Sequence, residues 1–130
     1  MDIETAQTRI QEIEQEMAAL RRERNALSLV ADPAIVRDVV RARMPEAASI
    51  VAKFIAERDG DDYYPYLDIF KVFDANGEQL YVDDSDVTGV ETKFFAQEDE
   101  ALMMALDRLR KSLDHWQMRV DLDTLQAKWA

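Results

Sequence analysis

Residues Tyr66–Asp84, YLDIFKVFDANGEQLYVDD, hold the pattern that decides the expected fold. Two apolar and aromatic runs flank the turn sequence DANG at residues 74–77. An Asp or Asn before Gly between such runs is typical of a β-hairpin. We therefore expect two antiparallel strands here, with Gly77 at the positive φ angle that this turn requires.

The strands of this hairpin can pair in two registers. A two-residue loop places Phe70 opposite Asp83, whereas a three-residue loop places Phe70 opposite Val82. We favour the three-residue loop, because a slip of one residue moves side chains to the other face of a sheet. The favoured register gathers four apolar side chains on one face, namely Phe70, Val72, Leu80 and Val82. It also sets Asp68 opposite Asp84, where two like charges repel.

A heptad pattern occupies the chain before the hairpin. Its apolar positions, in alternating steps of three and four, are Ile3, Ala6, Ile10, Ile13, Met17, Leu20 and Leu27. Arg24 occupies one position of the same series. The spacing predicts a long helix with a narrow apolar seam that must be buried against another helix. The partner is either the same helix of a second chain, giving a homodimer through Ile3–Leu27, or the C-terminal helix of this chain.

One or two shorter helices are expected between this helix and the hairpin. Asp32 is a preferred N-cap residue and Pro33 suits the first helical position, so a helix is expected to begin there. It runs to Met44, because the residue before a proline is disfavoured in a helix. Pro45 then opens a second helix that runs to Arg58. The two helices could instead be one kinked helix.

Beyond the hairpin we expect a third strand over Val87–Phe95 and a second long helix over Gln97–Val120. The apolar stripe of this helix is Leu102, Leu106, Leu109, Leu113, Trp116 and Val120. The expected fold is therefore α+β. Long N-terminal and C-terminal helices flank one or two short helices and a small antiparallel β-hairpin or three-stranded sheet. We expect one domain of 130 residues, with segments 1–31, 32–58, 59–96 and 97–130.

The composition narrows the function classes. The chain has no cysteine, which removes disulfides, thiolate chemistry and cysteine-based zinc sites and suits a cytoplasmic protein. No apolar run approaches the roughly 20 residues of a membrane helix, and the acidic N-terminus is unlike a signal peptide. We therefore expect no membrane partner.

The net charge of −11 is concentrated in one part of the chain. Residues 59–100 hold thirteen acidic residues against Lys71 and Lys93, so this segment carries −11 and the rest of the chain is balanced. Acidic charge opposes direct binding of nucleic acid and favours a basic protein as the partner. The charge can equally reflect the preference for Asp and Glu at turns and helix N-termini, and their effect on solubility.

Aspartates and tyrosines bracket the hairpin, and we predict that they form the rim that binds the basic partner. Tyrosines are enriched at protein interfaces, where they act as anchors. The predicted partner-binding residues are Asp61, Asp62, Tyr63, Tyr64, Tyr66, Asp83, Asp84 and Asp86.

Catalytic chemistry has little support in the sequence. The single histidine, His115, stands apart from any nucleophile motif. The glycine of DANGEQLYVDD falls too early for a calcium-binding EF-hand loop. We therefore expect no enzyme activity, no metal and no cofactor.

The sequence favours a small acidic, non-enzymatic binding protein that occludes or recruits a basic partner. An inhibitor of a nuclease, including a nucleic-acid mimic, or of a basic toxin would fit. The alternative is a coiled-coil structural or assembly subunit that forms homo-oligomers. A weak metal-dependent enzyme is the third possibility. Salt-sensitive capture of a partner would favour the binding protein, and salt-insensitive self-assembly would favour the assembly subunit.

Overall fold

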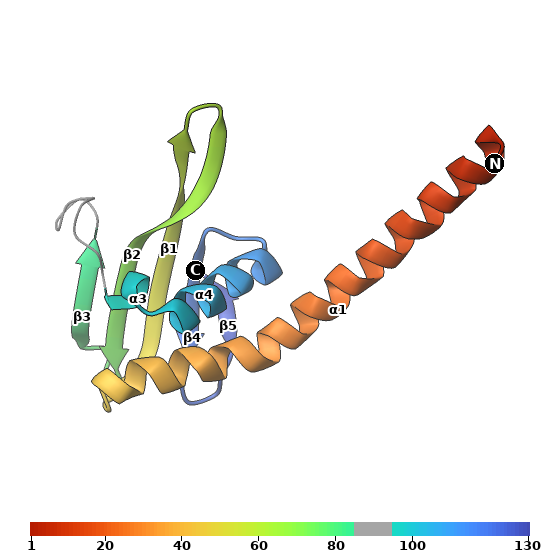
Figure 1. Ribbon diagram of the computed structural model, residues 1–130. Coiled ribbons are helices and arrows are strands. Elements are labelled where there is room, and N and C mark those ends of the chain that lie inside the picture. The colour runs from red at the N-terminus through yellow and green to blue at the C-terminus, as the bar shows by residue number, and fades with distance from the viewer. Residues whose placement is uncertain (85–94) are drawn as a thin grey trace.

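The protein is a long helix joined to a five-stranded antiparallel sheet, as the computed structural model in Figure 1 shows for residues 1–84 and 95–130. Strand order in the sheet is β3-β2-β1-β4-β5. Figure 1 shows the C-terminal half of α1 with α3 and α4 on one face of the sheet, while the N-terminal half of α1 projects as an arm. The elements are α1 (Ile3–Arg43), β1 (Ala47–Asp59), β2 (Asp62–Asp74), β3 (Gln79–Asp84), α3 (Phe95–Glu98), α4 (Glu100–Leu113), β4 (Gln117–Asp121) and β5 (Ala127–Trp129).

Helix α1 is longer than the sequence predicted. Asp2 caps its N-terminus by accepting a hydrogen bond from the Thr5 amide at 2.7 Å. At 1.5 Å per residue, its 41 residues extend for about 60 Å. The predicted helix start at Asp32 and Pro33 is wrong, because α1 runs through both residues without a break. Asp32 caps no helix here, since its carboxylate is buried against α4.

The predicted helix from Pro45 to Arg58 is strand β1. Ile50 and Phe54 recur at a spacing that also fits a helix, and Val51 and Ile55 follow each of them. In a strand the same residues place one apolar set on each face, as is usual for a central strand. The segment forms a strand because its backbone hydrogen-bonds to β2 along one edge and to β4 along the other.

The predicted long C-terminal helix is also wrong. Helix α4 ends at Leu113, and Asp114 adopts a left-handed conformation with φ of 53° that terminates it. Strand β4 follows and pairs with β1, so that Met118 and Val120 point into the core. Leu102, Leu106 and Leu109 form the buried stripe of α4 as expected. The fold is α+β, but a five-stranded sheet replaces the small hairpin or three-stranded sheet.

The DANG turn joins β2 to β3, and Gly77 has the predicted positive φ, at 81°. The favoured register holds only beside the turn, where Phe73 lies opposite Gln79. A bulge then shifts the pairing, so that Phe70 lies opposite Asp83 and Val72 lies opposite Tyr81. Tyr81 explains this choice, because its ring packs edge-on against Phe70 on the core face. Leu80 and Val82 are exposed at the edge of the sheet. The predicted repulsion is absent, because Asp84 lies opposite Ile69.

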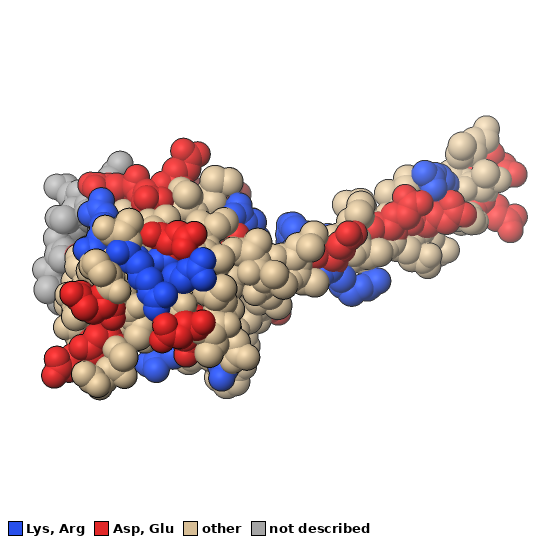
Figure 2. Space-filling model, turned by 90° about the horizontal axis from the view of Figure 1, so that it is seen from below, with Lys and Arg blue, Asp and Glu red and all other residues tan. Residues whose placement is uncertain are grey.

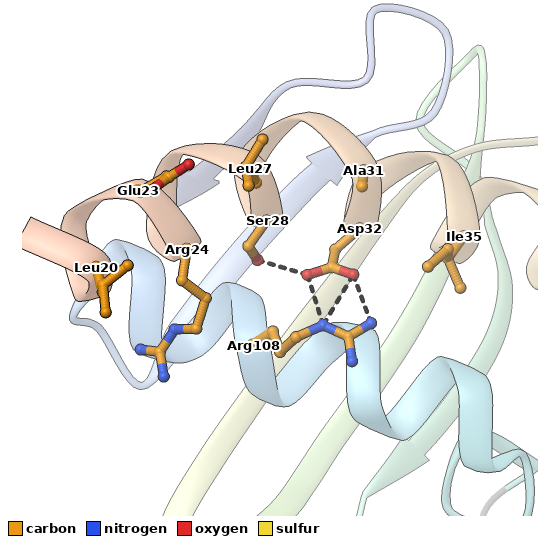
Figure 3. A pocket seen from close by; sticks show the side chains of 9 residues that line it. All are labelled: Leu20, Glu23, Arg24, Leu27, Ser28, Ala31, Asp32, Ile35 and Arg108. Atoms are coloured by element: carbon orange, nitrogen blue, oxygen red, sulfur yellow. Dashed lines mark hydrogen bonds and ion pairs between the residues drawn. The ribbon is translucent and has the colours of Figure 1, made fainter. Parts of the chain in front are cut away.

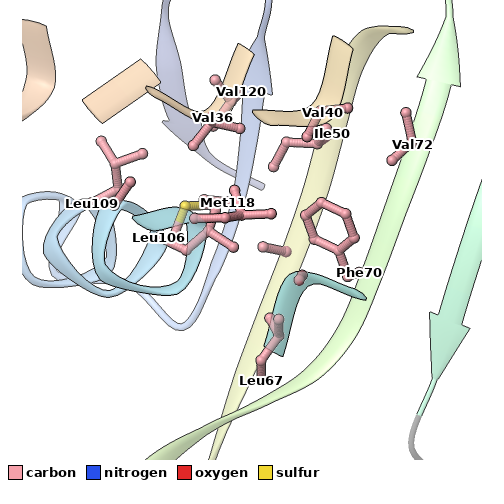
Figure 4. Close-up of a cluster of buried hydrophobic side chains, with 14 of the residues drawn as sticks. Val36, Val40, Ile50, Leu67, Phe70, Val72, Leu106, Leu109, Met118 and Val120 are labelled. Carbon is pink, nitrogen blue, oxygen red and sulfur yellow. The ribbon is translucent and has the colours of Figure 1, made fainter. Parts of the chain in front are cut away.

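The hydrophobic core lies between the sheet and its covering helices (Figure 4). Val36 and Val40 of α1 meet Ile50 of β1, while Leu106 and Leu109 of α4 complete the layer. The core therefore begins only in the second half of α1. The predicted third strand, Val87–Phe95, falls outside the described residues except for Phe95, which begins α3.

Candidate binding surfaces

The arm of α1 carries an uncovered apolar seam. Ile3, Ile10, Ile13, Met17, Leu20 and Leu27 are each 40% to 78% exposed. The first buried residue along α1 is Ser28. Figure 1 shows the arm extending away from the sheet and from α4, so the predicted packing of this seam on the C-terminal helix does not occur. We name these six residues, with Ala6 and Arg24, the seam.

A groove opens where the arm meets the globular part, with a volume of about 530 Å³. Figure 3 shows its walls, which come from α1 on one side and from Arg108 of α4 on the other. Three of the lining residues, Leu20, Arg24 and Leu27, belong to the seam. The other lining residues are Glu23, Ser28, Ala31, Asp32, Ile35 and Arg108. The seam therefore continues from the arm into the groove.

Asp32 and Arg108 form a two-pronged ion pair at the floor of the groove (Figure 3). The Arg108 Nη2 donates to Asp32 Oδ1 at 2.7 Å, and its Nε donates to both carboxylate oxygens at 3.0 and 3.1 Å. The Ser28 hydroxyl donates to Oδ2 at 2.5 Å. Hydrogen bonding to Asp32 raises the pKa of Arg108 above its ordinary value. All donors face one carboxylate, which is the geometry of a structural pair rather than of a reactive group.

The first predicted group of partner-binding residues lies at the tip of the β1–β2 hairpin. Gly60 has a φ of 63° and turns the chain between Asp59 and Asp62. Asp61, Asp62, Tyr63 and Tyr64 are exposed there, while Tyr66 is half-buried. Figure 1 shows this hairpin rising beyond the other strands.

The second predicted group lies at the end of β3, apart from the tip. Asp84 pairs with Ile69, which is five residues from Tyr64 along β2, or about 17 Å at strand rise. Asp83 accepts a hydrogen bond from the Tyr81 hydroxyl, and burial raises the pKa of its carboxyl. Asp86 lies outside the described residues. The structure therefore brings the tip residues together but does not join them with Asp83 and Asp84 in one rim.

Several acidic side chains of residues 59–100 have local structural roles. Asp74 accepts hydrogen bonds from the Asn76 and Glu78 amides in the turn, both at 2.9 Å. Asp99 caps α4 by accepting from the Leu102 amide at 2.9 Å. Turn and cap positions thus account for part of the acidic excess, as the alternative explanation of the charge required.

Basic side chains share the sheet with this acidic excess. Lys71, Val51, Arg119 and Lys128 are opposite one another in four neighbouring strands, so they form one row on the face turned away from α4. Figure 2 views the molecule from below and shows Lys and Arg side chains gathered on the globular part, with acidic side chains around them and along the arm. The sheet is therefore not uniformly acidic.

Sequence reasoning missed the groove and its ion pair. Asp32 precedes a proline, which made it resemble an N-cap, and its partner lies 76 residues away. The one available signal was Ser28 four residues before Asp32, a spacing that places both on one helix face.

His115, the one histidine of the chain, belongs neither to the groove nor to the hairpin tip. His115 is exposed and stacks on the Trp129 ring at 5.0 Å. Residues 1–84 and 95–130 contain no cluster of His, Cys, Asp and Glu side chains that could hold a metal ion.

Within the described ranges, each helix is too short or too polar to cross a bilayer. No protein-family model, curated protein or solved structure matches the chain.

Proposed function

We propose that this protein is a non-enzymatic assembly subunit that forms a homodimer through the seam of α1. The exposed seam on a projecting helix is the observation that carries the proposal. Its apolar residues follow the heptad spacing of a coiled coil, in which two such stripes bury each other. A cytoplasmic location is part of this proposal, because the lack of cysteine suits a reducing compartment.

The arm would gain stability from a second helix. It makes no buried contact before Ser28, so most of its length is held only by helix-internal interactions. Isolated helices of this length are marginal in water, and most helix stability comes from burying an apolar face. The seam of a second copy has the same spacing, so it can cover the apolar residues along the whole arm.

A second candidate function is capture of a basic protein at the tip of the β1–β2 hairpin. The observation that favours it is the exposure of Tyr63 and Tyr64 beside Asp61 and Asp62. Exposed aromatics flanked by charge are typical of interface anchors. An inhibitor of a nuclease or toxin remains within this second candidate, since nucleases and many toxins present basic surfaces.

Sedimentation equilibrium tests the first candidate. The wild type should be a dimer, and the double variant Ile10→Asp with Ile13→Asp should be a monomer, because two carboxylates in each seam oppose pairing. The globular part should keep its thermal transition, since neither residue contacts the core. A wild type that is monomeric at about 100 µM, far above a typical dimer dissociation constant, would refute the proposal.

The matched control places the same charges on the opposite face of the arm. Thr8→Asp with Gln15→Asp adds two carboxylates at positions that lie away from the seam. This variant should remain a dimer. If it dissociates as the seam variant does, net charge rather than seam burial controls association.

A separate assay tests the second candidate. Immobilised protein is exposed to cationic proteins at low and high salt, and the wild type is compared with Tyr63→Ser and Tyr64→Ser. Weaker capture of the cationic protein by the two variants than by the wild type would support binding at the tip. Capture by the wild type should also be faster at low salt than at high salt, because the aspartates attract the cationic protein over a distance. Equal capture by all three proteins would count against it.

A further inference from the structure

The side chains that flank the seam decide in which direction two copies of α1 pair. We propose that they pair in parallel and in register, so that both globular parts lie at the same end of the dimer. This inference rests on the proposed function, because it concerns the same seam. It adds the direction, the register and the residues that fill the groove.

The seam divides into the two core positions of a coiled coil. In heptad notation, Ile3, Ile10, Met17 and Arg24 of the seam are at a, and Ala6, Ile13, Leu20 and Leu27 are at d. β-branched residues at a with Leu at d favour two-stranded parallel coils. The first two a residues are Ile and the last two d residues are Leu, as in two-stranded coils, while Ile13 at d departs from that pattern.

Charged residues beside the seam match in a parallel dimer. There, each g residue faces the e residue five positions further along the partner. Arg9 then faces the partner's Glu14, and Glu16 faces the partner's Arg21. Both pairs are attractive, and symmetry repeats each of them.

The two remaining charged g residues meet no like charge. Asp2 faces the partner's Gln7, and Glu23 faces the partner's Ser28. In the single chain Arg9 lies 3.2 Å from Glu12 and 3.6 Å from Glu16. Those pairs are exposed and weak, so Arg9 is free to turn to a partner chain.

The next flanking pair is apolar and leads into the groove. Val30 is at g and is 74% exposed. Five positions later, Ile35 lines the groove between α1 and Arg108 (Figure 3). Parallel pairing sets the partner's Val30 against Ile35 and thus fills the groove with an apolar side chain.

Arg24 is the one charged residue at a core position. In a parallel pair its side chain packs into a hole that includes the preceding g residue of the partner, which is Glu23. The same hole also contains the partner's Arg24, so two guanidinium groups lie side by side, and the flanking Glu23 residues supply a counter-charge only when the two helices are in register. Polar residues at a cost stability and fix the register of coiled coils, which is the role assigned to Arg24 here.

Antiparallel pairing fits these residues less well. If Ile3 lies opposite the partner's Leu27, then g residues face g residues and e residues face e residues. Arg9 still meets the partner's Glu23, which is attractive, but Glu14 and Glu16 each meet the same residue of the partner near the centre of the dimer, where like charges repel. Val30 meets the carboxylate of the partner's Asp2 instead of an apolar side chain.

Disulfide cross-linking of single-cysteine variants tests the direction, and the natural chain has no cysteine to interfere. Ile10→Cys should form a disulfide-linked dimer on mild oxidation, because residues at the same a position are neighbours in a parallel pair. Ile10→Cys with a size tag is then mixed with untagged Leu20→Cys. Parallel pairing gives cross-links only between identical variants, whereas antiparallel pairing gives the mixed species.

The outcomes separate this inference from the proposed function. A mixed cross-link would overturn parallel pairing and leave the homodimer intact. A wild type that is monomeric by sedimentation would overturn both. A wild-type dimer in which neither cross-link forms would overturn in-register parallel pairing, and the Ile10→Asp with Ile13→Asp variant would then show whether the seam or another surface associates.

Val30→Lys provides a second measurement that does not depend on cysteine. In a parallel dimer it places a cation in the apolar groove beside Arg108, so the dimer dissociation constant should rise at least tenfold. In an antiparallel dimer the lysine would meet the partner's Asp2, and the dissociation constant should fall. An unchanged or lower constant would therefore contradict the parallel arrangement.

Discussion

Asp32 is the single residue that most clearly links α1 to the globular part. Its side chain is 3% exposed, whereas that of Arg108 is 36% exposed. A carboxylate this deeply buried is stable only when it is paired and hydrogen-bonded, and Arg108 and Ser28 meet both needs. The pair therefore fixes how α1 lies on α4.

Asp32→Ala should lower the free energy of unfolding by about 2–3 kcal/mol. Breaking a buried pair leaves the other charge unpaired, but Arg108 keeps some access to water, which limits the loss. Asp38→Ala is the control, because Asp38 pairs with Arg37 at the surface. It should change stability by less than about 0.5 kcal/mol. Urea unfolding measures both, and equal effects would contradict the role given to Asp32.

Asp83 and Asp121 should respond to pH in opposite directions. Burial raises the pKa of Asp83 in the folded protein, so its ionisation destabilises the fold at neutral pH. A hydrogen bond from the Thr124 amide lowers the pKa of Asp121, so its ionisation stabilises the fold. At about pH 7, Asp83→Asn should therefore be more stable than the wild type and Asp121→Asn less stable.

Both differences should shrink as the pH falls. The penalty from Asp83 disappears below its unfolded pKa of about 3.9, where the carboxyl is protonated in both states. The contribution of Asp121 is complete above that value and is lost as the pH falls through the lower folded pKa. Urea midpoints measured between about pH 7 and pH 3 check this. Differences that do not change with pH would contradict the titration.

At the scale of secondary structure, β4 shows how tertiary pairing overrides a local pattern. The C-terminal residues show helical spacing from Leu102 to Val120, yet the helix stops at Leu113. β1 has a hydrogen-bonding edge on the side away from β2, and β4 satisfies it. An uncovered edge at the centre of the sheet would leave backbone groups unpaired.

Met118 distinguishes the strand from the predicted helix. It lies off the apolar stripe of that helix, but in β4 it is fully buried. Met118→Ala should therefore cost about 2–4 kcal/mol, the usual effect of truncating a buried methionine. Met104→Ala is the control, because Met104 is half exposed on α4 and should cost less than about 0.5 kcal/mol. If thermal unfolding shows that the two variants lose similar stability, the assignment of Met118 to a buried strand is contradicted.

At the scale of the whole molecule, the residues of the arm are not the residues of α1 that pack into the globular part. The cluster of buried core residues includes residues of α1 only from Val36 onward. The ion pair with Arg108 involves Asp32 of the same helix. The seam faces solvent in the single chain. If parallel pairing holds, the two hairpin tips stand at one end of the dimer, which would strengthen binding of a partner that has two sites.

A chain that lacks residues 1–24 should fold and be monomeric. Its thermal midpoint should not depend on protein concentration, whereas that of the full chain should rise with concentration, because dimerisation stabilises the folded state. Removing residues 1–35 is the contrasting deletion, since it also removes Asp32 and Ser28 from Arg108. It should lower the midpoint or prevent folding. Concentration-dependent melting of the first deletion would contradict dimerisation through the arm.

The sequence by itself determined the features that depend on neighbours along the chain. The arm and its seam follow from heptad spacing, the turn follows from Asn76-Gly77, and the buried stripe of α4 follows from leucines at helical spacing. The sequence also predicts Asp61, Asp62, Tyr63 and Tyr64 as partner-binding residues, but not the β1–β2 hairpin whose tip holds them, because it predicts a helix up to Arg58.

Only the tertiary structure decided the strands β1 and β4, the register of β2 with β3, and the place of Asp32. Each depends on a partner far along the chain: β1 pairs with β4, Tyr81 packs on Phe70 beneath α3, and Asp32 meets Arg108 across 76 residues. A pattern such as Ile50, Val51, Phe54 and Ile55 satisfies a helix and a strand equally. The choice falls to the strand because hydrogen bonds along both backbone edges and the burial of Ile50 and Phe54 are gained only when the distant strand and the covering helices are in place.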